Sequence, residues 1–363
     1  MDYADRTAVF RRRLEPQRLD AYWLVSAPNV RYLSGFTGED STLLVTPGRT
    51  ILITDSRYVE QAERECPVDE VVSRHTPMAR AVGMLCKSQG VRRLGVTATN
   101  LIHAQYEALV SAATTVQVRS RPSGIAEEMR RRKSPPEVKA IRAAVRVAET
   151  AFGNLLQGLE PGQTERWLAA RLEYEMRALG ADGAAFETIC AVDANASVPH
   201  ARSGDAAVEG GSCVLFDWGA RLAGYCCDLT RVIALSTIPA RWKAFVDVVL
   251  DAQAAVFQEL RPGVRCAEVD AAGRAVIARA GFGRHFGHGI GHGVGLSVHE
   301  GPRLGPGGDT VLLPGMVVTV EPGIYLAGEV GVRLEQMALI TADGHEPLTT
   351  LPQRPEDLPI GGR

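Results

Sequence analysis

The sequence predicts two domains, a smaller α/β domain followed by a larger α+β domain that is built as an internal repeat. A chain of 363 residues exceeds the length that one hydrophobic core usually serves. Before about residue 125, short strand-like runs alternate with helical patterns, which is typical of an α/β domain. After that point, similar segments recur 101 to 104 residues apart, which indicates two related halves.

The composition is that of an ordinary globular protein and excludes several functions. Hydrophobic residues make up 45% of the chain and charged residues 23%, so the chain can build a core. A formal net charge of -2 gives no overall attraction for nucleic acid or an anionic membrane. No apolar run approaches the roughly 18 residues of a membrane span, and the first residues lack the apolar segment of a secretory signal. Seven cysteines without a CxxC pair favour a reduced, cytoplasmic protein.

The first domain is predicted to contain a β-hairpin and further strands and helices. Apolar runs at 42–45 and 50–53 flank the Pro47-Gly48 turn, which predicts the hairpin. The other expected elements are strands at 21–25, 94–96 and 116–118 and helices at 77–88 and 103–113.

A charged stretch from Glu127 to Lys133 separates the two domains. Ser134 is a candidate N-cap, with prolines after it and Glu137 completing a capping box, so a helix is expected over 136–157. Basic residues in the stretch could also form a nucleic-acid patch, but the near-neutral chain favours a linker. We therefore expect domains over residues 1–125 and 126–363.

The second domain repeats a pattern of helix and strand. The segments 159–162 and 260–263 both read Leu-x-Pro-Gly and both precede a helical run. Further along, the segment 214–219 resembles the segment 318–323. We infer two α+β halves related by a pseudo-two-fold axis, and the cleft between such halves is a natural place for a site.

Each half contributes a hairpin with two carboxylates, Asp217 and Asp228 in the first and Glu321 and Glu335 in the second. Any one of them alone would more simply be a cap or a surface residue. As a duplicated set on apolar strands they are expected to be buried, where carboxylates are costly unless paired or bound to a cation. Two divalent metal ions would offset four converging charges, whereas a neighbouring arginine alone could not.

The histidines support a metal site. Glycine occupies every second position from Gly287 to Gly295, so an extended chain would place His288 and His292 on one face. No helical pattern follows this segment, which argues against a phosphate-binding loop. Carboxylate and imidazole ligands without thiolates suit manganese, cobalt or zinc in a hydrolytic site. The clustered histidines are His200, His285, His288, His292 and His299.

The set Asp217, Asp228, His292, Glu321 and Glu335 resembles the five-ligand dinuclear site of the pita-bread metallopeptidases. The resemblance extends over nearly the whole chain, because the segments 29–36 and 54–58 are similar to the creatinase-type N-terminal domain. Methionine aminopeptidases generally lack that domain, which makes aminopeptidase P and prolidase the nearest match. The resemblance implies a creatinase-like α/β domain, a pita-bread α+β domain and two divalent ions, with manganese preferred over cobalt or zinc.

The resemblance also implies a role for each ligand position. Asp217 and Asp228 would bind one metal ion, and His292 and Glu321 would bind the second. Asp228 and Glu335 would bridge the two ions, and Glu321 would also shuttle the proton of the attacking hydroxide.

Further residues match family positions near the substrate. His200 corresponds to a histidine beside the substrate, His299 to one that stabilises the tetrahedral intermediate, and His288 to one that lines the proline subsite. Arg303 lies where some prolidases place an arginine against the substrate carboxylate, although a surface arginine is nearly as consistent with the sequence. Arg333 would support the site from behind the ligands.

We therefore expect an Xaa-Pro aminopeptidase that hydrolyses the bond before proline at the N-terminus of peptides by attack of a metal-bridged hydroxide. The alternative is an Xaa-Pro dipeptidase (prolidase). The expected partners are proline-containing peptides or dipeptides and a second copy of the chain in a homodimer, as the resemblance implies.

One position departs from the family pattern. The last motif usually reads Arg-Ile-Glu-Asp, and here Gln336 follows Glu335. Gln336 is the only support for a catalytically silent binding protein on the same fold. A metal-free amidinohydrolase of the creatinase type is a further alternative. All five ligand positions are kept, so an active metalloenzyme is expected.

Overall fold

The computed structural model describes residues 2–360, and the chain divides into two compact units between residues 130 and 131. The dividing point lies a few residues beyond the predicted domain boundary.

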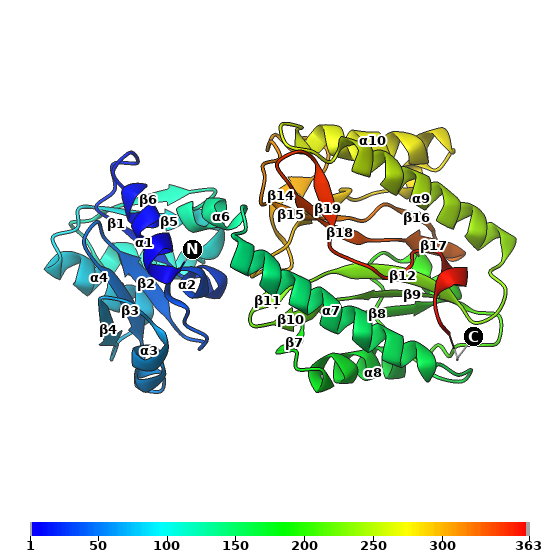
Figure 1. The fold of residues 1–363 in the computed structure, drawn as a ribbon. Coiled ribbons are helices and arrows are strands. Elements are labelled where there is room, and N and C mark those ends of the chain that lie inside the picture. The colour runs from blue at the N-terminus through cyan, green and yellow to red at the C-terminus, as the bar shows by residue number, and fades with distance from the viewer. Residues whose placement is uncertain (1, 361–363) are drawn as a thin grey trace. The chain divides into compact units, whose positions relative to one another are not determined.

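The first unit is built on a mixed six-stranded sheet in the order β4-β3-β2-β1-β5-β6 (Figure 1). The predicted hairpin forms, since β2 and β3 pair antiparallel with Val45 opposite Thr50. β1 pairs antiparallel with β2 and parallel with β5. All four residues of β1 are buried, so the centre of the sheet is covered on both faces. The strands are β1 (Ala21–Leu24), β2 (Thr42–Val45), β3 (Thr50–Thr54), β4 (Glu70–Ser73), β5 (Arg93–Thr97) and β6 (Gln117–Arg121).

Two of the helices of the first unit, α4 and α5, form where the sequence predicted them, whereas α1, α2, α3 and α6 were not predicted. α2, α3 and α6 are short, with 8, 7 and 6 residues. α1 is as long as α5 but buries only Arg6 and Phe10, so no apolar stripe marks it in the sequence. The helices are α1 (Tyr3–Arg12), α2 (Ala27–Ser34), α3 (Val59–Glu65), α4 (Met78–Ser88), α5 (His103–Ala112) and α6 (Ile125–Arg130).

The second unit begins with the predicted long helix. Ser134 is its N-cap, and the backbone N–H of Ser134 donates to Glu137 Oε2 over 2.9 Å, so the expected capping box is present. The helices pack as two pairs, one on each side of the strands (Figure 1). They are α7 (Pro135–Gln157) with α8 (Glu165–Ala178), and α9 (Ala240–Glu259) with α10 (Cys266–Arg279).

The strands repeat one order in both halves of the second unit, as the internal repeat predicted. In the first half β9 pairs antiparallel with β12, and β10 and β11 lie between them along the chain. In the second half β15 pairs antiparallel with β18, and the β16–β17 hairpin lies between them. The strands are β7 (Gly183–Ala184), β8 (Ile189–Val192), β9 (Cys213–Trp218), β10 (Ala220–Leu222), β11 (Tyr225–Cys226), β12 (Leu229–Ala234), β13 (Gly291–Gly293), β14 (Glu300–Leu304), β15 (Val317–Val320), β16 (Gly323–Leu326), β17 (Val330–Arg333), β18 (Gln336–Ile340) and β19 (His345–Pro347).

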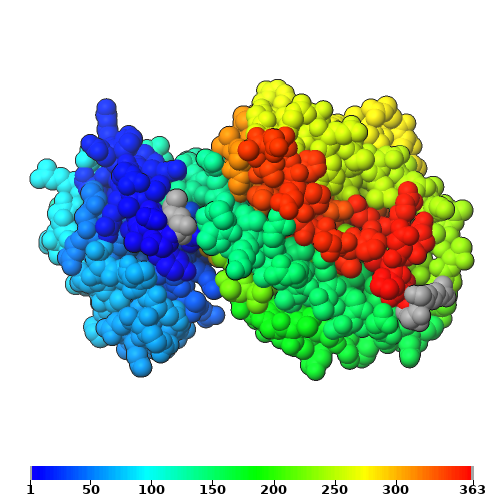
Figure 2. Space-filling view, viewed as in Figure 1, coloured from blue at the N-terminus to red at the C-terminus, as the bar shows by residue number. Residues whose placement is uncertain are grey.

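The segment that follows β19 lies on the surface of the second unit between α7 and α9 (Figure 2, red). The carboxylate of Glu149 on α7 accepts a hydrogen bond from the hydroxyl of Thr350 over 2.7 Å. Arg354 forms an ion pair with Asp247 on α9 at 2.8 Å. The buried guanidinium of Arg231 donates to two carbonyl oxygens of the same segment, which fastens the segment to β12.

A close backbone contact joins β17 to the 3-10 helix η2 (Asp193–Ser197). A Cβ atom on Gly331 would lie 1.7 Å from the carbonyl oxygen of Ala196, so only glycine fits there. The contact holds the loop that leads to His200 against the strand that ends at Arg333.

We predict that Gly331→Ala lowers the thermal unfolding midpoint of the second unit. Overpacking a tight contact costs about 1–3 kcal/mol, and each kcal/mol shifts the midpoint by about 2–4 °C in a unit of this size. Gly210→Ala is the matched control, because a Cβ atom there meets nothing within 4 Å. Calorimetry should show a lower midpoint for the first variant alone, and equal midpoints would contradict the packing described.

Candidate metal centre

The five predicted metal ligands all line one cavity of about 1000 Å³ in the second unit. They reach it from the ends of strands in both halves of the internal repeat. Asp217 lies on β9, Asp228 immediately before β12, His292 on β13, Glu321 immediately after β15 and Glu335 immediately before β18.

Strand pairing brings the two halves of the site together. Thr230 lies opposite Asp217 in the β9–β12 ladder. Its carbonyl oxygen accepts from the backbone N–H of Glu335 over 3.1 Å, and its hydroxyl donates to Glu335 Oε2 over 2.8 Å. We did not predict this residue from the sequence, although its position two residues after Asp228 places both side chains on one face of an extended chain.

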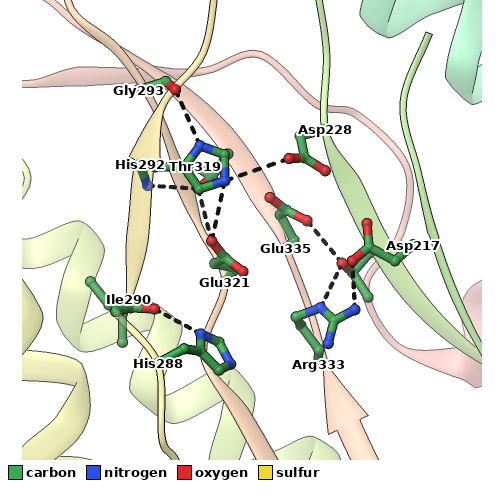
Figure 3. A network of polar contacts seen from close by, with 12 residues as sticks. Asp217, Asp228, His288, Ile290, His292, Gly293, Thr319, Glu321, Arg333 and Glu335 are labelled. Atoms are coloured by element: carbon green, nitrogen blue, oxygen red, sulfur yellow. Dashed lines mark hydrogen bonds and ion pairs between the residues drawn. The ribbon is translucent and has the colours of Figure 1, made fainter. Parts of the chain in front are cut away.

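The acidic and imidazole side chains form three overlapping groups that could hold a metal ion, and two of them share Glu335 (Figure 3). The third group joins Asp228 and His292 to His299. The carboxylate oxygens of Asp217, Asp228 and Glu335 lie within 4.8 Å of one another, and so do the ligand atoms of His292, Glu321 and Glu335. Nε2 of His292 is 3.6 Å from Asp228 Oδ2 and 3.4 Å from Glu321 Oε1. Two groups that share one carboxylate suit two cations with a bridging ligand.

Three carboxylate oxygens in this cluster are buried without a hydrogen-bond partner among residues 2–360: Asp217 Oδ1, Asp228 Oδ1 and Glu335 Oε1. A buried carboxylate oxygen without a partner is strongly destabilising, and a cation is the partner that such an oxygen accepts best. The residues present therefore fit divalent metal ions.

The ionisation of these groups follows from their burial. Burial raises the pKa of Asp228 and of Glu335 well above the usual range, and the neighbouring carboxylates act in the same direction. Burial also raises the pKa of Glu321 to about 7. By contrast, burial lowers the pKa of His292 to about 4, so the imidazole is neutral at pH 7, which is the form that binds a metal ion.

Arg333 is the arginine that contacts the cluster directly, and it reaches in from the end of β17. Its guanidinium forms an ion pair with Asp217 (Figure 3). It also donates to the hydroxyl of Tyr325 over 2.8 Å. One guanidinium beside four carboxylates orients Asp217 but leaves most of the negative charge without a counter-charge. No sequence signal pointed to Tyr325.

The glycine-rich segment is less extended than the sequence suggested. Only Gly291–Gly293 form a strand, β13, and His288 precedes it. His288 still lines the cavity, and its Nε2 lies 3.0 Å from the hydroxyl of Tyr325. The glycines do allow close backbone approach, since a Cβ atom on Gly291 would lie 2.1 Å from the carbonyl oxygen of Thr319.

His200 and His299 also line the cavity, and both are exposed. The ring of His299 lies 4.3 Å from the ring of His292, measured between centroids. His285 does not line the cavity. Its Nδ1 lies 3.2 Å from the carbonyl oxygen of Tyr325, which makes it a neighbour of the site instead.

Four arginines line the same cavity: Arg131, Arg202, Arg303 and Arg333. We predicted Arg303 and Arg333 from the sequence, but not Arg131 or Arg202. Arg303, on β14, is exposed and lies opposite His292 in the β13–β14 ladder. Arg131 was assigned to the linker because of the charged residues around it, and nothing in that run distinguishes it from its neighbours.

Gln336 lies away from the carboxylates. It is the first residue of β18, and its Oε1 accepts a hydrogen bond from the hydroxyl of Thr349 over 2.7 Å. Because successive residues in a strand face opposite sides of the sheet, Gln336 faces away from Glu335 and from the cavity. Gln336, the residue on which the silent binding protein depended, is therefore absent from the cavity lining.

Two observations bear on the expectations drawn from composition. No helix within residues 2–360 has the length and apolar character needed to cross a membrane. All seven cysteines are free, so the odd number reflects no disulfide framework in the described chain.

Comparison with known proteins identifies relatives over most of the chain. An uncharacterized peptidase, YqhT, from Bacillus subtilis is 37% identical, with 92% of this chain and 95% of that protein covered. Among solved structures, an Xaa-Pro dipeptidase from Bacillus anthracis superposes with a TM-score of 0.92 at 34% identity and covers 97% of this chain and 99% of its own. An X-Pro aminopeptidase from Thermotoga maritima superposes with a TM-score of 0.86 at 33% identity, with 94% and 99% covered.

Two family patterns match the chain, one in each unit. Residues 6–131 match the creatinase/prolidase N-terminal domain, and residues 139–342 match metallopeptidase family M24. The second match spans more than half of the chain and includes all five converging side chains. The predicted architecture, a creatinase-like domain followed by a pita-bread domain, is thereby confirmed. The chain belongs to metallopeptidase family M24 and is a metal-dependent peptidase.

Proposed function

We propose that this peptidase hydrolyses the bond between a first residue and proline, with two divalent cations held by Asp217, Asp228, His292, Glu321 and Glu335. The observation that carries the proposal is the set of three buried carboxylate oxygens without partners, which face one cavity together with the neutral imidazole of His292. Ligands of this kind, without thiolates, favour manganese, with cobalt and zinc as alternatives.

When bound, two such cations polarise a carbonyl oxygen and lower the pKa of a water molecule. The residues of the chain supply the rest of the chemistry. We assign Glu321 to carry the proton released from the attacking water, because its carboxylate reaches the cavity beside His292. His299 and His200, exposed on the same cavity, are assigned to donate hydrogen bonds to the substrate carbonyl oxygen as negative charge develops there.

The remaining cavity residues would position the substrate. We assign His288 to the proline subsite, where its ring is held by the hydroxyl of Tyr325. Arg333 fixes that same hydroxyl and Asp217, so it supports the subsite and the metal ligands together.

Dipeptides are the substrates that we favour. The solved relatives include an Xaa-Pro dipeptidase and an X-Pro aminopeptidase at nearly equal identity, so the names alone do not separate the two activities. Arg303 lies on the cavity wall opposite His292 and is exposed. Its guanidinium favours a substrate in which the proline residue itself carries the free carboxylate. The Xaa-Pro aminopeptidase activity, which we expected first from the sequence, is the second candidate.

The homodimer and the cytoplasmic location stay predictions.

Hydrolysis of short peptides by metal-stripped protein, with and without added manganese, tests the proposal. We expect manganese-dependent cleavage of Ala-Pro, with Ala-Pro-Ala cleaved much more slowly and Ala-Ala not at all. Preferential cleavage of Ala-Pro-Ala would establish the aminopeptidase instead. If none of the three peptides is cleaved with manganese, cobalt or zinc, the proposed activity is wrong.

We expect His292→Ala to lower kcat/KM by more than about 100-fold, because removal even of a residue that only orients a ligand typically costs 10–100-fold. The apoprotein should keep the thermal midpoint of the unmodified apoprotein. His285→Ala is the matched control, since His285 lies outside the cavity. Turnover near the normal rate in His292→Ala would contradict the assigned metal ligand.

A further inference from the structure

Arg131 lines the metal cavity, although it stands in the charged stretch before α7. Its neighbour Lys133 anchors this part of the chain to the second unit. The Lys133 side chain is 1% exposed, and its ammonium group pairs with Glu300 Oε1 at 3.0 Å. The Lys133 backbone N–H donates to the carbonyl oxygen of Gly315 over 2.7 Å. A buried ion pair and a backbone hydrogen bond therefore fix the position of Arg131, two residues away.

The side chain of Arg131 lies against β14 at a glycine. A Cβ atom on Gly301 would be 2.8 Å from Arg131 Nε and 3.4 Å from its Cγ, so the arginine occupies the space that a larger residue would fill. Because Gly301 has no side chain, the side chain of Arg131 can pack against β14 on the cavity wall.

Arg303 lies two residues further along the same strand. In the β13–β14 ladder Arg303 is directly opposite His292, and residues directly opposite one another in a ladder share one face of the sheet. Both arginines line the same cavity beside β14, where two long side chains can reach toward a common anion.

Within residues 2–360 neither guanidinium has a hydrogen bond or ion pair of its own, and no carboxylate lies within ion-pair distance of either. Arg333, which also lines the cavity, pairs with Asp217, and Arg274 pairs with Asp270 at 2.8 Å. Arg202, the fourth arginine on the cavity wall, is exposed and lies outside β14, two residues after His200. Two unpaired guanidinium groups on the wall of a cavity form a site for a planar anion, for which arginine is the best-suited side chain.

We infer that Arg131 acts with Arg303 to bind the free carboxylate of the residue that follows the scissile bond, and that Arg131 thereby restricts the enzyme to dipeptides. The inference rests on the proposed function, because it places the substrate with its carbonyl group at the metal ligands and its carboxylate at β14. Arg131 is a specificity-determining residue in this account and takes no part in the bond cleavage itself.

The test compares Ala-Pro with its C-terminal amide, which lacks the negative charge, on manganese-loaded protein. Arg131→Met should raise KM for Ala-Pro by roughly 10- to 100-fold, as expected for the loss of charge-assisted hydrogen bonds. Both kcat for Ala-Pro and kcat/KM for the amide should stay within about threefold of the unmodified values. Arg131→Lys should restore part of the loss, because lysine keeps the charge but not the planar fork.

Arg132→Met is the matched control. Arg132 is adjacent, exposed and absent from the cavity wall, and its Nε donates to the carbonyl oxygen of Pro314 over 3.0 Å. Gly301→Ala provides a second variant that keeps Arg131 but displaces its side chain. It should also reduce the preference for Ala-Pro over the amide.

Equal losses on Ala-Pro and its amide in Arg131→Met would show a structural role and overturn the inference, as would unchanged kinetics on both substrates. Either result leaves the proposed function standing, provided that the unmodified protein cleaves Ala-Pro. If the unmodified protein cleaves neither substrate, the proposed function fails and the inference fails with it.

Discussion

Four carboxylates converge in one cavity of this protein, those of Asp217, Asp228, Glu321 and Glu335. Among residues 2–360 the arginine side chain in ion-pair contact with them is that of Arg333, and the arrangement of the second unit depends on how the remaining negative charge is compensated. Three of the carboxylate oxygens are buried without a partner in the described chain. Replacing such groups with apolar residues would be the simpler way to build a core, so their presence indicates that an external cation belongs to the folded state. Cation binding would then contribute both to the stability of the second unit and to its chemistry.

The internal repeat explains how a chain of this length brings these groups together. Each half supplies one antiparallel strand pair with acidic residues at its ends, and the two pairs meet through Thr230, whose carbonyl oxygen and hydroxyl both bond Glu335. The helix pairs cover the outer sides, so the cluster is buried where the halves meet. Because Gly291 and Gly331 have no Cβ atom, their backbones can pack closely against the carbonyl groups of Thr319 and Ala196.

The carboxylates could be predicted from the sequence because their signal is a repeated pattern on apolar strands, which depends on period and spacing rather than on tertiary contacts. The capping box at Ser134 was predictable for the same reason, as a local pattern with a local cause. By contrast, α1 is too polar to show an apolar stripe, and its position is set by packing. The extended form expected for the whole glycine-rich segment was wrong outside Gly291–Gly293, since alternating glycines permit strand pairing but do not impose it.

Residues that act through contacts distant in the sequence escaped prediction. Tyr325 meets His288 and Arg333 only in the folded chain, and Arg131 reaches the cavity only because Gly301 leaves it space. Gln336 was instead predicted to affect the site, because it follows the ligand Glu335 in the sequence. In the structure, strand alternation turns its side chain to the other face of the sheet, where it accepts a hydrogen bond from Thr349.

The central claim is that two divalent cations occupy the carboxylate cluster. Anomalous diffraction at the manganese edge, from crystals grown with manganese, tests it most directly. The account predicts two peaks in each chain, about 3.5–4 Å apart, both contacting Glu335 and together contacting Asp217, Asp228, His292 and Glu321. A single peak, or none at these side chains in the presence of excess manganese, would contradict it.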